Sequence, residues 1–66
     1  MYRTDIAIHN GSKTASIGYN VTVNEYRVRL WEGDKPVVEA DYFTDDKDDA
    51  IGTGRAMIGL PARRPQ

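Results

Sequence analysis

The sequence predicts an α+β domain, a four-stranded antiparallel meander sheet with one C-terminal α-helix packed on one of its faces. Apolar and polar residues alternate from Ala15 to Val23, which is the period of a half-buried strand. Turn signals separate four extended stretches, and an aspartate-rich segment then leads into apolar residues at helical spacing. The 66 residues allow a single ββββα domain, expected over residues 1–60, with a flexible tail over residues 61–66.

The first hairpin is expected to begin with a strand over Tyr2–His9. Asn10-Gly11 follows, and this pair favours a type I′ turn because both of its central positions need positive φ. A two-residue loop at this pair would place His9 opposite Ser12. The apolar side chains of the two strands would then share one face.

The second hairpin is expected to turn at Asn24-Glu25, because Asn tolerates the left-handed region. This turn would set Val23 opposite Tyr26 and Val21 opposite Val28. All four apolar side chains would then face the core.

The third hairpin is expected to join Tyr26–Trp31 to Val37–Phe43. A two-residue Gly33-Asp34 loop would place Arg29 opposite Val38 and so mix the two faces of the sheet. A three-residue loop keeps the faces apart and is therefore predicted. It gives the inner pairs Leu30–Val38, Val28–Ala40 and Tyr26–Tyr42, and the outer pairs Arg29–Glu39 and Arg27–Asp41.

The helix is expected to start at an N-cap formed by Thr44 or Asp45, and the following aspartates suit its positive end. Gly59, with Pro61 beyond it, predicts the helix end, where Leu60 can complete a Schellman cap. One stripe of the helix is expected to face the sheet and consists of Ala50, Ile51, Gly54, Met57 and Ile58.

Charge is distributed very unevenly along the chain. The acidic segment, Glu32–Asp49, holds eight of the ten acidic side chains and two lysines, a formal charge of 2 − 8 = −6. The rest of the chain carries 7 − 2 = +5. Such a charge pattern influences the choice of partner more than the fold.

The residues give little support to a catalytic function. There is no cysteine, and His9, the single histidine, is expected beside a turn on the polar face without a catalytic partner. The aspartates of 45–49 lack the spacing of a calcium-binding loop. We therefore expect a non-enzymatic protein with no cofactor and no metal. No membrane span or signal-peptide core is visible, so a cytoplasmic location is expected.

Part of the chain resembles the strand–strand–helix half of a double-stranded-RNA-binding domain. The resemblance covers residues 26–40, Thr44 and the helix from Asp49 to Ile58. In that family, lysines at the helix start bind phosphates. Residues 45–49 of this chain are Asp, Asp, Lys, Asp and Asp, which would repel RNA. The resemblance therefore implies a shared topology and argues against direct nucleic-acid binding.

The same pattern, a hairpin followed by an Asp-rich cap and a helix, is similar to HicB-type antitoxins and to small phage-encoded inhibitors, including some anti-CRISPR proteins. This resemblance implies a phage or mobile-element inhibitor that places an acidic surface in a nucleic-acid-binding site of a host protein or ribonucleoprotein complex. Trp and Arg are common in binding hot spots, so Arg27, Arg29 and Trp31 on the outer face of the sheet are included among the candidates. The candidate partner-binding residues are Arg27, Arg29, Trp31, Glu32, Asp34, Asp45, Asp46, Asp48 and Asp49.

Two alternatives remain open at this point. One is a small nucleic-acid-binding accessory protein that uses its basic residues. These residues are Arg3, Lys13, Arg27, Arg29, Arg55, Arg63 and Arg64. The other is a structural homodimer joined through an exposed sheet edge or through the face that carries Trp31.

Overall fold

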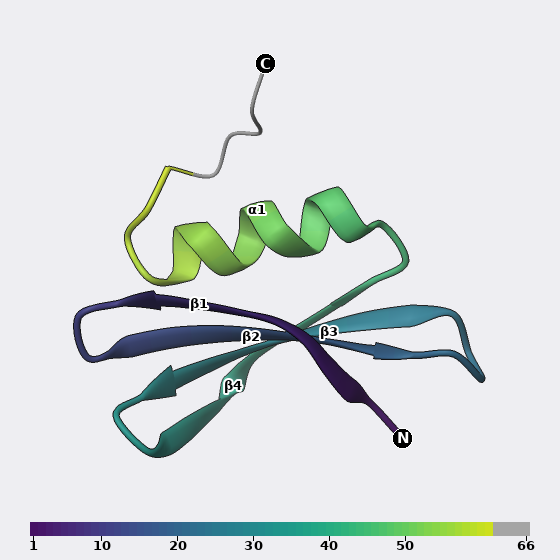
Figure 1. Cartoon of the computed structure of the whole chain (residues 1–66), viewed down its shortest axis with the longest axis horizontal. Coiled ribbons are helices and arrows are strands. Elements are labelled where there is room, and N and C mark those ends of the chain that lie inside the picture. Colours follow the sequence, from purple (N-terminus) through teal and green to yellow (C-terminus); the bar gives the residue numbers. More distant parts are fainter. Residues whose placement is uncertain (62–66) are drawn as a thin grey trace.

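The computed structural model describes residues 1–61 and has the predicted ββββα architecture. Its four strands form one antiparallel sheet in the order β1-β2-β3-β4, and a single helix lies across one face (Figure 1). The elements are β1 (Arg3–Asn10), β2 (Lys13–Asn20), β3 (Glu25–Glu32), β4 (Lys35–Thr44) and α1 (Lys47–Met57). Of the predicted tail over 61–66, all but Pro61 lies outside the described residues.

The core lies between α1 and the middle of the sheet. Ile17 and Val28 of the sheet and Ala50 of the helix are completely buried. The predicted helix stripe is confirmed, with Gly54 also buried and Ile58 2% exposed. Half-buried apolar side chains surround this centre, namely Ile6, Ile8, Tyr26, Ile51 and Met57.

The β1–β2 turn lies one residue later than predicted. Asn10 pairs with Lys13, so the loop is Gly11-Ser12, with Gly11 at a φ of +64°. A positive φ at the first central position suits a type II′ turn, in which glycine takes that place. From Ile6 to Asn10 the register therefore differs from the predicted one by two residues, which leaves these side chains on their expected faces. Before the irregularity, Thr4 pairs with Gly18, so the predicted face is wrong for the start of β1.

The β2–β3 loop is wider than predicted and contains four residues, 21–24, because Asn20 pairs with Glu25. Asn24 has the expected positive φ, at +54°. Val21 and Val23 are 78% and 59% exposed, so the prediction that they belong to the core is wrong. Side-chain bonds hold the wider loop: Tyr19 donates to Asn24 Oδ1, and Asn20 Oδ1 accepts from the Thr22 amide at 3.0 Å.

The β3–β4 turn is shorter than predicted. Glu32 pairs with Lys35 across the two-residue loop Gly33-Asp34, and Gly33 has a φ of +64°. Farther along the ladder, residues 38–41 of β4 lie opposite Arg29 alone, between the pairs Leu30–Val37 and Val28–Tyr42. These three extra residues on β4 reverse the parity that a two-residue loop would otherwise impose. The predicted three-residue loop and its inner pairs are therefore wrong.

The helix ends as the sequence predicts. Gly59 has a φ of +84°, the Leu60 amide donates to the Arg55 carbonyl at 2.9 Å, and the Gly59 amide donates to the Ala56 carbonyl at 3.2 Å. This is the predicted Schellman arrangement. In addition, the side-chain Nδ2 of Asn10 donates to the Ile58 carbonyl at 2.7 Å, which connects the end of β1 to the end of α1.

Candidate functional site

The turn between β4 and α1 displays four aspartates at the positive end of the helix. Asp46 is the N-cap, where either Thr44 or Asp45 was predicted, and Asp46 Oδ1 accepts from the amides of Asp48 and Asp49 at 2.9 and 3.3 Å. Thr44 Oγ1 in turn accepts from the Asp46 amide at 3.2 Å, which fixes the turn. The group Asp45, Asp46, Asp48 and Asp49 is exposed to solvent.

Two further contacts anchor this turn to the sheet. The Tyr42 hydroxyl donates to Asp49 Oδ2 at 2.7 Å, and this hydrogen bond raises the pKa of the Tyr42 phenol. Lys47 Nζ lies 3.6 Å from Asp5 Oδ2, and both side chains are about half exposed. The acidic corner, defined here as Asp5, Asp45, Asp46, Asp48, Asp49 and Lys47, carries 1 − 5 = −4 formal charges.

Asp5 did not belong to the predicted site. It reaches the helix start because the β1–β2 register shifts between Thr4 and Ile6. Nothing in the sequence around Asp5 indicates this shift, and 40 residues separate it from Asp45. Only the structure shows that Asp5 belongs to the acidic corner.

The other two predicted acids, Glu32 and Asp34, do not belong to this corner. They lie at the β3–β4 turn, at the opposite end of β4 from the helix start. Ten strand residues at ~3.3 Å each would span about 30 Å. Glu32 is moreover paired across the sheet with both Lys13 and Lys35, so the turn is locally neutral. The acidic segment is therefore continuous in the sequence but divided on the surface.

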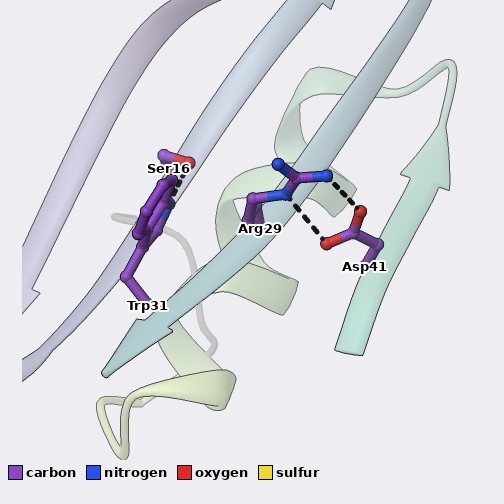
Figure 2. Close-up of polar contacts among 4 residues, drawn as sticks. All are labelled: Ser16, Arg29, Trp31 and Asp41. Atoms are coloured by element: carbon purple, nitrogen blue, oxygen red, sulfur yellow. Dashed lines mark hydrogen bonds and ion pairs between the residues drawn. The ribbon is translucent and has the colours of Figure 1, made fainter. Parts of the chain in front are cut away.

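Arg29 and Asp41 form the main ion pair on the face of the sheet opposite α1. Arg29 Nη2 lies 2.8 Å from Asp41 Oδ2, and Nε donates to Oδ1 at 3.2 Å (Figure 2). This two-pronged hydrogen bond raises the pKa of the guanidinium. The predicted pairs Arg29–Glu39 and Arg27–Asp41 are wrong, because the extra residues in β4 shift Asp41 opposite Arg29.

Trp31 is on the same uncovered face as Arg29, as expected from their spacing in β3. Its indole N–H donates to Ser16 Oγ at 3.1 Å, and the ring is partly buried (Figure 2). The hydrogen bond fixes the indole against β2, so Trp31 also has a structural role in covering the sheet.

Arg27 belongs to an aromatic cluster that sequence reasoning missed. Its guanidinium carbon lies 4.5 Å from the centre of the Tyr2 ring, and Tyr2 meets Phe43 edge-on with ring centres 6.3 Å apart. The Tyr2 hydroxyl donates to Glu25, a contact that raises the pKa of the phenol. Phe43 remains 49% exposed. The alternation that puts Glu39 and Asp41 on the outer face also puts Phe43 there, but its contact with Tyr2 depends on the strand registers.

The basic residues do not gather on one surface within the described part of the chain. Arg29 is held by Asp41, and Arg55 Nε donates to the Pro61 carbonyl at 2.7 Å. Arg3 and Lys13 lie at opposite ends of the first hairpin, because Arg3 pairs with Tyr19 and Lys13 with Asn10. Arg63 and Arg64, named with the basic residues, lie outside the described residues.

His9 is exposed and shares a 2.9 Å hydrogen bond between its Nδ1 and Thr14 Oγ1. Among residues 1–61, no group of three or more His, Asp or Glu side chains is arranged to hold a metal ion. The described residues also contain no helix with the length and apolar character that crossing a membrane requires.

No family model, curated protein or solved structure matches this chain. Its function is therefore inferred from its own surfaces, of which the acidic corner and the uncovered face of the sheet have the most distinctive chemistry.

Proposed function

We propose that this chain is a non-catalytic binding protein whose acidic corner occupies a basic, nucleic-acid-binding site on another protein. The observation that carries the proposal is the concentration of charge, with five carboxylates and one ammonium group at a single strand-to-helix turn. The four aspartates of the turn are exposed, so they can reach a partner without refolding.

The geometry of the corner suits a competitor of phosphate. Carboxylates can take the place of phosphate oxygens opposite lysine and arginine, and such contacts weaken as salt concentration rises. The bonds made by Asp46 and Asp49 hold the turn in one conformation before binding. A rigid anionic surface loses less conformational entropy on binding than a flexible acidic tail.

The resemblance to small phage-encoded inhibitors gives the proposal its most concrete form. In that form the protein is a phage or mobile-element inhibitor, similar to anti-CRISPR proteins, that blocks the nucleic-acid-binding site of a host defence complex. The partner is then a host protein or ribonucleoprotein complex.

A matched pair of variants tests the proposal. Asp45→Asn with Asp48→Asn removes two carboxylates from the corner and leaves the Asp46 cap and the Asp49–Tyr42 bond in place. Glu32→Gln with Asp34→Asn removes two carboxylates from the same sequence segment at the other end of β4. Each protein is immobilised, and nucleic-acid-binding proteins are captured from a bacterial lysate at low and high salt.

The expected result is salt-sensitive capture by the wild type and by the hairpin-turn variant, with strong loss in the corner variant. Added DNA or RNA should compete with the wild type for the captured protein. Equal capture by all three proteins would overturn the proposal. Retention of the wild type on heparin, together with a gel shift of DNA or RNA, would instead support direct nucleic-acid binding.

A further inference from the structure

The two edges of the sheet differ in how well they are protected from pairing with another strand. On β4, Pro36 lacks an N–H group, and the irregularity at residues 38–41 interrupts the edge. Both features are known to prevent edge-to-edge association. On β1 the ladder is irregular only at its start, and Ile6–Asn10 pairs regularly with β2 without any proline or lysine.

The β1 edge also carries apolar side chains that the helix only partly covers. α1 packs against β2, β3 and β4, and Ile6 and Ile8 of β1 are half-buried. A strand added beside β1 would cover more of both isoleucines, although α1 reaches β1 at its two ends through Lys47 with Asp5 and through the Ile58 carbonyl with Asn10. Among residues 1–61 only five apolar residues are buried, so additional burial would benefit a chain of this size.

We propose that β1 pairs with β1 of a second copy, in antiparallel orientation and with Ala7 on the two-fold axis. The two-residue turn makes Asn10 and Lys13 a hydrogen-bonded pair, and such pairs alternate along an antiparallel ladder. Ala7 and His9 therefore direct their backbone N–H and C=O groups away from β2. Ala7 can exchange two hydrogen bonds with Ala7 of the second copy.

This register is self-complementary in its side chains. It places Ile6 opposite Ile8 of the second copy, and Ile8 opposite Ile6, so that four isoleucines form one apolar strip on the helix side of an eight-stranded sheet. No charged residue lies between Ile6 and Ile8, so no like charges meet across the centre of the new ladder. An axis on Ile8 would also let Ala7 and His9 pair with the second copy, but Ile8 would then face itself and Ile6 would face Asn10. The continuous isoleucine strip therefore favours the axis on Ala7.

A single cysteine tests this register, because the chain has none of its own. Cα atoms of a hydrogen-bonded antiparallel pair lie about 5.5 Å apart, within the range that a disulfide can bridge. Ala7→Cys should therefore form a covalent dimer on mild oxidation of the full chain. His9→Cys is the matched control on the same exposed face, since its two Cα atoms would lie about 14 Å apart.

Light scattering on the wild type should give twice the mass of one chain, and Ala7→Asp, which sets two carboxylates face to face on the axis, should give the monomer mass. Circular dichroism and thermal unfolding confirm that each variant is folded. Ala7→Cys should crosslink roughly tenfold faster than His9→Cys or more. A monomeric wild type at its highest soluble concentration, or equal crosslinking of the two cysteine variants, would overturn the proposal.

Discussion

The two faces of the sheet are built on different principles. The face under α1 consists of apolar side chains such as Ile17 and Val28 that are removed completely from water. The opposite face is held by discrete polar contacts, Arg29 with Asp41 and Trp31 with Ser16 (Figure 2). The free energy gained by burying apolar area grows with the area buried. Each polar contact only replaces a hydrogen bond that the same groups would make with water, so its net contribution is small. The covered face should therefore dominate the free energy of unfolding.

Ile17→Ala gives the largest expected effect. The side chain is completely buried between the sheet and α1, so the truncation loses apolar burial and leaves a cavity. We expect a loss of ~2–5 kcal/mol in the free energy of unfolding, which can leave so small a domain largely unfolded. Val38→Ala is the control, since Val38 is 61% exposed. Urea unfolding followed by circular dichroism measures both, and similar losses would contradict the distinction between the faces.

Two glycines of α1 give the next largest effect, with opposite signs. A Cβ on Gly54 would lie 3.2 Å from Ala15 Cβ, which can move only with its strand. Overpacking of ~1–3 kcal/mol should outweigh the ~1 kcal/mol gain in helix propensity, so Gly54→Ala should lower the melting temperature. Gly52 is less buried, and Gly52→Ala should raise it. A rise in both variants would show that the contact between α1 and β2 is looser than described.

The sequence predicted well which strand side chains lie under α1. In a regular strand, the face on which a side chain lies depends only on whether its position is odd or even. From Ile6 to Asn10 the β1–β2 register is two residues away from the expected one, and that even shift kept these side chains on their expected faces. Cross-strand partners are harder to predict, because they depend on loop lengths and bulges that no local pattern shows. In the last hairpin, a wrong loop length and an unforeseen irregularity in β4 together changed every predicted partner.

In the candidate site, too, the local features were predicted and the features that depend on strand register were not. Asp45, Asp46, Asp48 and Asp49 were predicted together because they are neighbours in the chain, and the helix start keeps them together. The separation of Glu32 and Asp34 from them follows from the length of the intervening strand. Strand registers that the sequence does not determine bring Asp5 to the acidic corner. They also bring Tyr2 and Phe43 close to Arg27.

A double-mutant cycle tests the ion pair of the uncovered face. Arg29 and Asp41 are joined by two hydrogen bonds and are only partly exposed, so Arg29→Ala with Asp41→Ala should show a coupling of about 1 kcal/mol. The same cycle with Glu39→Ala should show a coupling near zero. A larger coupling to Glu39 would indicate that β3 and β4 pair without interruption and that β4 has no irregularity. High salt should weaken the Asp41 coupling only partly, because the pair is half-buried.

The smallest expected effect lies where the alternating pattern and the fold disagree. The alternation from Ala15 continues to Val21 and Val23, yet both valines lie in the β2–β3 loop and are 78% and 59% exposed. Val21→Thr and Val23→Thr keep the shape of the side chain and should change the free energy of unfolding by no more than ~0.5 kcal/mol. The same change at Val28, which is completely buried, places an unpaired hydroxyl in the core and should cost ~1–3 kcal/mol. If threonine at Val21 or Val23 costs as much as at Val28, the strands continue past Asn20 in solution, and the alternating pattern predicts this region better than the wide loop does.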